Sequence, residues 1–319
     1  MGASSPSGAR AAWGSLGQGR RRRLPADAIM GYAFIAPAVI LYLTFSGYPI
    51  VRGITIAFSD YRYLLPNWQP FNGIDNWVQM SRDATFFTAL GRSATYASAY
   101  IPVLVILGIT VAILISRVFN PVEASLYRVI AYLPVVLPIA VALLLWQQVL
   151  NNQFGYVNYF WRDVLHLPGA PRWLIDAQWI IPTFVIAGVW KQVGQTVLLF
   201  LIGLYGINTE LYEAAAIDGA GAWRQFTDIT VPLLRPTFVL VLVLSAGILG
   251  MAEDTLIFFP TTYGPGNAAL LVGRYSYDIA FRLGDMRWGY AAAINLTVGI
   301  ISMVYSGVIF RLLRGGGAD

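Results

Sequence analysis

Few residues of this chain could do catalytic chemistry. The 319 residues include no cysteine and a single histidine, His166. This composition disfavours thiolate metal sites, redox centres and histidine-based triads, because each needs residue types that the chain lacks. A phosphate-binding loop needs a lysine directly after a glycine-rich turn, and the one lysine, Lys191, follows no such loop. We therefore expect no catalytic residue, no metal site, no cofactor and no ATP hydrolysis by this chain.

A second group of residues stands inside apolar sequence, where binding is the expected chemistry. Its members are Trp190, Lys191, Gln195, Glu253 and Asn295. Gln195 follows Lys191 by four positions and so shares its helix face. Charges within a membrane are costly and usually face protein or a water-filled path. Two interpretations stay open: these residues contact a polar solute, or they have structural roles such as helix packing by Trp190 or a pair of Lys191 with Glu253.

The acidic pair Glu253–Asp254 has the same two alternatives. It stands near the end of an apolar run, close in sequence to Arg274 and Arg282. A carboxylate beside a membrane span either pairs with such a cation or lines an aqueous opening. Both an ion pair with one of these arginines and a place at an outer gate remain possible.

The elements that must carry these residues are six charge-poor runs. A bilayer core requires about 20 apolar residues in a helix, because no water is available there to the backbone. The runs are 28–51, 93–116, 129–161, 177–208, 236–252 and 288–310. The third exceeds one span, so its polar end is expected to emerge from the bilayer, and the fifth continues to Pro260. The sequence predicts an all-α integral membrane protein with six transmembrane helices.

The composition supports this class. Hydrophobic residues make up 57% of the chain and charged residues 12%, against roughly 45–50% and 25% in soluble domains. The mean hydropathy is +0.61. The net charge of +5 is not gathered into a lysine-rich and arginine-rich face. An ordinary cytosolic enzyme and a nucleic-acid-binding protein are both disfavoured.

The arginines at the two ends predict the orientation. Arg20–Arg23 precede the first span, and Arg311 and Arg314 follow the sixth. Cationic residues beside spans favour the cytoplasmic side, so both termini are expected there. The first run is too long for a signal peptide and its hydrophilic lead is too extended, which predicts a retained helix.

The predicted organisation has three parts. Residues 1–27 form a basic cytoplasmic tail whose Gly-, Ser- and Ala-rich start is typical of disorder. Residues 28–314 form the transmembrane domain, and residues 315–319 a short cytoplasmic tail.

The inner segment 205–235 carries a short helix that has candidate capping residues at both ends. Asn208 or Thr209 can cap it, and Glu213 lies near its start, where a carboxylate suits the helix dipole. Its alanines form a small apolar face, and the glycines at 219 and 221 can end it. Small side chains allow another surface to approach closely. From periodicity alone, a plain connecting helix at the membrane interface fits as well.

This segment resembles the EAA signature of the permease subunits of bacterial ABC importers. That signature reads E-A-A, three residues, G, nine residues, I-x-L-P. The matching residues, with the spacing intact, are Glu213, Ala214, Ala215, Gly219, Ile229 and Pro232. Val231 stands where leucine is usual, which is a minor departure.

Further motifs are similar to the sugar-permease branch of that family. They are Asp218 beside Gly219, the outer segment Thr261–Asn267 with Tyr263 in place of a glycine, the segment Asn72–Trp77 and the start of the last span at Gly289–Ala293. The resemblance runs from about residue 30 to 314, nearly the whole chain. Each of these motifs is weak alone, whereas the EAA spacing is specific.

The resemblance implies a fold, a role and partners. The fold would be the MetI-like permease core, in a bacterial inner membrane. The role would be to form, by alternating access, the translocation path of an ATP-binding-cassette sugar importer. The implied partners are a second, homologous permease chain, two copies of an ATP-binding subunit, an extracytoplasmic solute-binding protein, membrane lipid and a sugar, with no nucleic acid. The residues expected to couple to the ATPase are Glu213, Ala214, Ala215, Asp218, Gly219 and Pro232.

Two other function classes are weaker alternatives. A self-sufficient secondary transporter or channel would need an intramembrane relay, for which only Lys191, Glu253 and Asp254 are available. An intramembrane enzyme would need a nucleophile and a base, and the chain has no cysteine, no G-x-S-x-G and one histidine.

Overall fold

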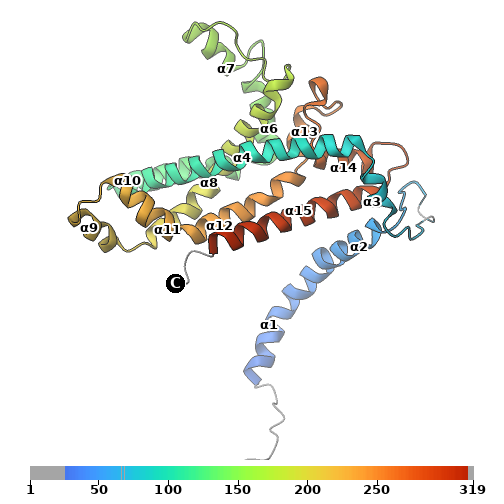
Figure 1. Ribbon diagram of the computed structural model, residues 1–319, viewed down its shortest axis with the longest axis horizontal. Coiled ribbons are helices and arrows are strands. Elements are labelled where there is room, and N and C mark those ends of the chain that lie inside the picture. Colours follow the sequence, from blue (N-terminus) through green and yellow to red (C-terminus); the bar gives the residue numbers. More distant parts are fainter. Residues whose placement is uncertain (1–25, 66, 68, 315–319) are drawn as a thin grey trace, which may run out of the picture. The chain divides into compact units, whose positions relative to one another are not determined.

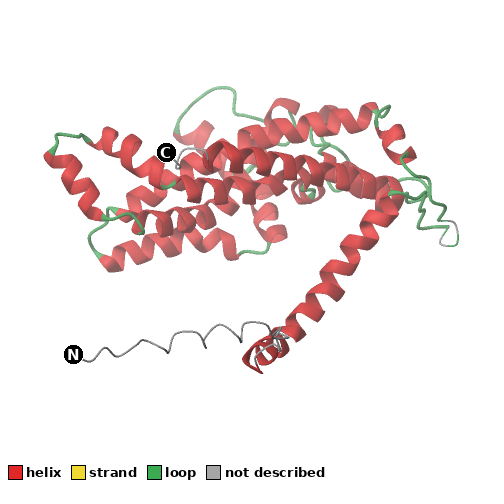
Figure 2. Cartoon of the chain, turned by 60° about the horizontal axis from the view of Figure 1, so that its bottom comes forward, coloured by secondary structure: helices red, strands yellow, loops and turns green. Residues whose placement is uncertain are grey.

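A computed structural model describes residues 26–65, 67 and 69–314. Within these residues the chain is helical, and its one β feature is an isolated bridge between Ser59 and Phe71 (Figure 2). The predicted all-α class is confirmed for this part of the chain. Nearly all of the predicted tail 1–27 and all of 315–319 lie outside the described residues. The chain divides into two units, 1–52 and 53–319.

The described part of the first unit is one apolar helical stretch. Helix α1 (Ala26–Tyr42) passes through a π-helical turn at Leu43–Gly47 into α2 (Tyr48–Ala57), which continues into the second unit. Large apolar side chains are exposed along it, among them Phe34 at 82%. The stretch Met30–Ala57 is long and apolar enough to cross a membrane, because a helix satisfies its own backbone groups in lipid.

Three long helices organise the second unit: α4 (Ala84–Ser116), α8 (Ala177–Tyr205) and α15 (Trp288–Arg314). Helix α4 packs along α8, and α12 and α14 pack along α15 (Figure 1). The shorter helices are α3 (Asp75–Met80), α5 (Pro121–Val136), α6 (Ile139–Val149), α7 (Tyr156–Tyr159), α9 (Thr209–Ile217), α10 (Ala222–Gln225), α11 (Val231–Leu233), α12 (Arg235–Leu244), α13 (Glu253–Phe258) and α14 (Val272–Phe281). Short π-helical and 3-10 turns lie at Phe160–Val164, Phe226–Thr230, Ser245–Gly250 and Pro265–Asn267.

Four of the six predicted runs coincide with helices that could cross a membrane. These helices span Met30–Ala57, Ala84–Ser116, Ala177–Tyr205 and Trp288–Leu313. The other two runs fall on helix pairs that are bent by more than 40° and reach a spanning length only as pairs. By length and composition, the described residues therefore hold four spans, or up to six if each bent pair counts as one.

The third predicted run is not a single helix. Helices α5 and α6 meet at an angle of 98°, and the two residues between them, Leu137 and Pro138, are extended, with ψ of 138° and 137°. Proline cannot donate a backbone hydrogen bond, and it disfavours the helical conformation at the residue before it. This local chemistry favours a break at Pro138 but does not by itself require one, since Pro102 and Pro182 lie inside continuous helices.

The fifth run is also interrupted. The segment Ala222–Leu233 meets Arg235–Gly250 at 64°. The chain then turns through the 3-10 segment Ser245–Gly250 into the short helix α13. Helix α13 packs against α6 and α14, so the end of this run folds back onto neighbouring elements.

Candidate functional site

The inner segment forms two short helices with capped ends. The Asn208 side chain accepts a hydrogen bond from the amide of Glu210 at 3.1 Å and thereby caps α9. Its amide group also donates to the Glu210 carboxylate at 3.0 Å. Of the two residues considered from the sequence, Asn208 is the cap, because the Asn side chain satisfies a backbone N–H that the helix start leaves free.

Gly219 ends α9 by its backbone conformation. Its φ is +80°, a left-handed conformation that glycine adopts without strain. The amide of Ala220 then donates to the carbonyl of Ala215 at 2.8 Å, and that of Gly219 to Ala216 at 3.1 Å. This is the pattern of a Schellman C-cap. A Cβ on Gly219 would meet no atom within 4 Å, so the requirement for glycine is conformational and not one of space.

Side-chain hydrogen bonds join α9 and the turn after it to α10 and the π-helical turn Phe226–Thr230. The Tyr212 and Thr230 hydroxyls lie 2.8 Å apart, and Gln225 donates to the carbonyl of Ala220 at 3.2 Å. The Thr230 hydroxyl also lies 3.3 Å from the carbonyl of Gln225. The spacing of Tyr212, Gln225 and Thr230 in the sequence does not predict a contact across a turn, so these residues were not expected at the site.

The surface of this segment is exposed and partly apolar. Glu213, Ala214, Asp218 and Gly219 are exposed, whereas Ala215 and Pro232 are partly buried. Two large side chains also face outward, Ile217 at 87% and Trp223 at 75% exposure. Exposed apolar side chains next to a charged rim are typical of a surface that another protein covers. In Figure 1, α9 and α10 lie at the opposite end of the second unit from α3.

A hollow of about 900 Å³ lies behind the two short helices. Its lining comes from the ends of α4 and α8 and from the inner segment, including Arg117, Tyr205, Tyr212 and Phe226. A cation–π contact lies at the end of α8, where the Arg128 guanidinium is 5.8 Å from the ring centre of Tyr205.

The residues predicted inside the membrane have identifiable neighbours. Lys191 donates to the backbone carbonyl of Val135 at 2.9 Å. The Trp190 ring meets the Trp146 ring edge-on, with centroids 5.7 Å apart. Gln195 accepts a hydrogen bond from Gln192 at 2.7 Å. These contacts favour structural roles for Lys191 and Trp190 over direct contact with a solute.

Asn295 and the acidic pair have different surroundings. Asn295 is exposed on α15 and accepts from the Ser276 hydroxyl at 2.8 Å. Asp254 is buried and accepts from the Tyr96 hydroxyl at 2.8 Å. Glu253 begins α13, and its side chain lies outside what the structure describes.

The two arginines suggested as partners of that pair both lie beside Asp278. Arg274 donates to Asp278 at 2.7 Å, and both side chains are almost fully buried. Arg282 lies 3.6 Å from the same carboxylate. Arg274 also donates to the carbonyls of Thr255 and Phe259 at 3.1 and 2.9 Å, so it holds the end of α13 against α14.

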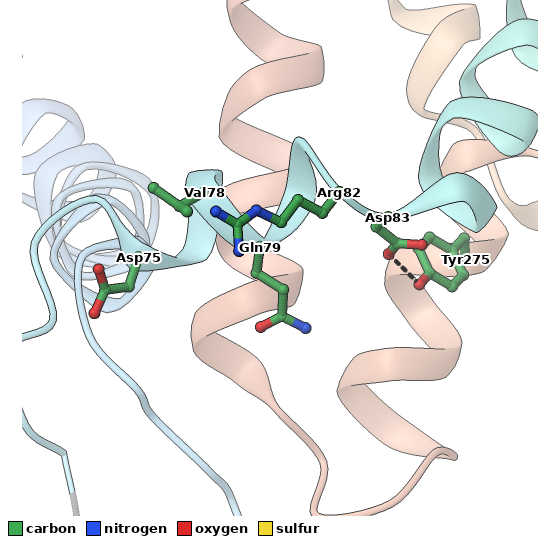
Figure 3. A pocket seen from close by; sticks show the side chains of 6 residues that line it. All are labelled: Asp75, Val78, Gln79, Arg82, Asp83 and Tyr275. Carbon is green, nitrogen blue, oxygen red and sulfur yellow. Dashed lines mark hydrogen bonds between the residues drawn. The ribbon is translucent and has the colours of Figure 1, made fainter.

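A polar pocket at the start of α4 was not anticipated from the sequence. It has a volume of about 610 Å³ and is lined by Asp75, Val78, Gln79, Arg82, Asp83 and Tyr275 (Figure 3). The Asp83 carboxylate accepts from the amides of Thr85 and Phe86 and from the hydroxyls of Tyr275 at 2.5 Å and Tyr290 at 2.7 Å.

These four hydrogen bonds set the protonation of Asp83. Burial alone would raise the pKa of the carboxyl, but the donors stabilise its charged form and the pKa lies below its ordinary value. Burial and the hydrogen bond to Asp83 raise the pKa of Tyr275. Asp83 is therefore a charged cap that ties α4 to α14 and α15.

Comparisons with known proteins place this architecture. Residues 78–315 match the family described as "Binding-protein-dependent transport system inner membrane component". The diacetylchitobiose uptake system permease protein NgcF of Streptomyces coelicolor is 30% identical, over 94% of this chain and 88% of its own length. The lactose transport system permease protein LacF of Rhizobium radiobacter is 27% identical, over 90% of this chain and 94% of its own.

A solved structure shares the fold. It is a crystal structure of a bacterial ABC transporter involved in the import of the acidic polysaccharide alginate, with a TM-score of 0.77 and 24% identity, over 92% of this chain and 97% of the matched chain. A second structure of a bacterial alginate ABC transporter, in complex with an alginate pentasaccharide-bound periplasmic protein, has a TM-score of 0.75 and 24% identity, over 90% of this chain and 95% of the matched chain. The match to the family covers most of the chain and its relatives are named as permeases. The chain belongs to the binding-protein-dependent transport system inner membrane components and is a permease subunit of an ABC importer.

Proposed function

We propose that this chain forms one half of the translocation path of an ATP-driven importer for a mono- or oligosaccharide. The names of the relatives NgcF and LacF, both sugar permeases, support the solute class. The observation that carries the coupling role is the exposed surface of α9, whose residues match the EAA signature and whose end is shaped by Gly219. A second permease chain, two ATP-binding subunits and an extracytoplasmic binding protein complete the assembly.

In this proposal α9 transmits the movement of the ATPase. Glu213 presents charge to the ATP-binding subunit, while Ala214, Ala215 and Gly219 allow close approach. Asp218 and Pro232 shape the turn and the entry to the following span. The bonds of Tyr212 with Thr230 and of Gln225 with Ala220 support this role, because they make the segment move as one body. The pore opens outward or inward according to which state the partners bind more tightly.

The proposed topology has six spans, with each bent pair counted as one, and both termini in the cytoplasm of a bacterial cell. Residues 1–27 are the basic tail, 28–314 the transmembrane domain and 315–319 the C-terminal tail. The arginines at both ends support this orientation.

Of the residues predicted for the solute path, Gln195, Glu253 and Asn295 remain our proposal, whereas for Trp190 and Lys191 the contacts with Trp146 and Val135 favour the structural alternative. The exposure of Asn295 on α15 supports a surface that faces the pore or the second permease. The Gln192–Gln195 pair supports a polar patch within an apolar span.

Isolation in mild detergent tests the proposed function. A second six-span permease and a protein with a phosphate-binding loop should copurify with this chain.

Glu213→Ala and Gly219→Pro should abolish stimulated ATP hydrolysis and uptake while the chain remains in the membrane. Solute transport in liposomes by the isolated chain without ATP would instead support a secondary transporter, and full uptake with Gly219→Pro would contradict the docking role.

A further inference from the structure

The bend between α5 and α6 deprives the last carbonyls of α5 of their helical donors, and a charged side chain donates to one of them. In a continuous helix the carbonyl of Val135 would accept from the amide of residue 139. Here Leu137 and Pro138 are extended, and α6 leaves at 98°. The ammonium group of Lys191, on α8, lies 2.9 Å from the Val135 oxygen.

The chemistry of the lysine suits this position. The last carbonyls of a helix carry the negative end of its dipole, where a cation is favourable. In apolar surroundings a carbonyl without a donor costs free energy, and no lipid group can supply the bond. An ammonium group has three donors on a long flexible stem. Lys191 is also the one lysine of the chain. A charge within a membrane span is costly, and here the ammonium group bonds a backbone carbonyl that has lost its helical donor.

A second contact fixes where Lys191 meets α5. Gly194, one turn further along α8, lies directly against α5, since a Cβ there would stand 2.2 Å from the carbonyl oxygen of Ala131. Positions 191 and 194 share a face of α8, as 131 and 135 share a face of α5. The close approach at Gly194 therefore sets the register that brings the ammonium group to Val135.

Helix α6, which follows the bend, packs against α8 and α13. Trp146 of α6 meets Trp190 of α8 edge-on, and Leu143 of α6 is buried in the same apolar cluster as Phe258 of α13. Helix α13 carries Asp254, which accepts from Tyr96. The angle of the bend thus determines how α6 supports α13.

We propose that Lys191 is a positioning residue: by capping the Val135 carbonyl it holds the α5–α6 bend, and through α6 it holds α13 in place. Lys191 contacts no solute in this proposal. The bend is a property of the chain itself, whereas its consequence for transport rests on the proposed function.

Distance measurements between spin labels test the bend. The absence of native cysteine allows labels at Leu145→Cys on α6 and Ile202→Cys on α8, which are 49% and 71% exposed. In the purified importer in lipid nanodiscs, Lys191→Met should broaden and shift the distance distribution. Lys191→Arg, which keeps a cationic donor, should retain a narrow one.

The matched control is Gln195→Met, which removes a polar group from the same face of α8 and should leave the distribution unchanged. An unchanged distribution with Lys191→Met overturns the proposal. If that variant does not assemble, Lys191→Gln is measured, and a distribution equal to that of the parent again overturns it.

ATP hydrolysis by the assembled importer separates positioning from solute contact. Lys191→Met should lower the maximal rate stimulated by the copurified binding protein roughly tenfold, as expected for loss of one charged hydrogen bond. The binding-protein concentration for half-maximal stimulation should stay the same, and Lys191→Arg should restore much of the rate. A changed half-maximal concentration with an unchanged distance would assign Lys191 to the solute. A parent complex without stimulated hydrolysis would refute the proposed function, while the distance result would still decide the role of Lys191 in the bend.

Discussion

Gly219 and Gly221 show how a residue type follows from backbone conformation. A Cβ at either position would meet no atom within 4 Å. Gly219 has φ of +80°, whereas Gly221 has φ of −68°, which any residue can adopt. Both glycines were predicted to end the helix, and only the left-handed one closes the C-cap, a distinction that sequence letters do not carry.

This pair predicts different effects of the same substitution. Gly219→Ala forces alanine into the left-handed region at a cost of about 1–2 kcal/mol, which should unwind the end of α9 and reduce binding of the ATP-binding subunit several-fold. Gly221→Ala is the matched control and should bind normally. The measurement is the amount of ATP-binding subunit that copurifies with equal amounts of each chain. If both variants retain equal amounts of the ATP-binding subunit, the left-handed conformation of Gly219 is not needed for its binding.

Asp83 predicts a specific pH dependence. Its pKa is lower in the folded chain than in the unfolded one, because its hydrogen bonds outweigh its burial. The resulting stabilisation is therefore complete above the unfolded pKa of about 3.9 and is lost as pH falls through the lower folded value. The difference in thermal stability between the parent and Asp83→Asn should be constant from neutral pH to about pH 5 and should shrink below about pH 4. Asp75→Asn, at an exposed position of the same pocket, should show no comparable effect. A difference between parent and Asp83→Asn that does not change with pH would contradict the assignment.

At the scale of elements, apolar runs predicted where helices lie but not where they break. Pro102 and Pro182 lie inside continuous helices, whereas Pro138 stands at a 98° bend. All three prolines lack the same donor, so the sequence alone does not separate them. The difference arises from tertiary contacts, since Lys191 supplies a donor to the carbonyl of Val135 beside the bend. The docking of α13 was likewise hidden, because Tyr96 lies 158 positions from Asp254. Arg274 is close in sequence, but it donates to the carbonyls of Thr255 and Phe259.

The packing of α13 against α14 depends on Arg274. Its guanidinium joins the buried Asp278 to carbonyls at the end of α13. Arg274→Met would leave a buried carboxylate without this partner and should destabilise the chain by roughly 3–5 kcal/mol. Arg282→Met removes a 40% exposed cation at 3.6 Å from the same carboxylate and should cost only about 0–1 kcal/mol. Thermal unfolding in detergent compares the two, and equal losses would show that burial does not distinguish the pairs.

At the scale of the whole molecule, the family followed from one spaced motif, whereas membrane topology rests on charge. The EAA spacing depends on local helix and turn geometry, so letters at fixed offsets are enough to recognise it. Asp83, at the start of α4, accepts from Tyr275 and Tyr290, which lie 192 and 207 positions further along the chain. No local sequence pattern predicts such contacts. Orientation depends on the membrane and on the arginines near it, which a fold alone does not specify.

The proposed topology predicts which positions a membrane-impermeant thiol reagent reaches. In a chain without native cysteine, Leu283→Cys lies in the proposed outer segment after α14 and is 47% exposed. Val122→Cys and Leu312→Cys, 75% and 73% exposed, lie on the proposed cytoplasmic side. The reagent should label Leu283→Cys in cells whose inner membrane is intact and whose outer layers admit the reagent. It should label the other two only after the inner membrane is permeabilised. Because six spans return the chain to its starting side, a cysteine in the N-terminal tail should behave like Leu312→Cys. If the two ends label from opposite sides, one bent pair does not cross the membrane, and the helices at 98° and 64° are then the first places to examine.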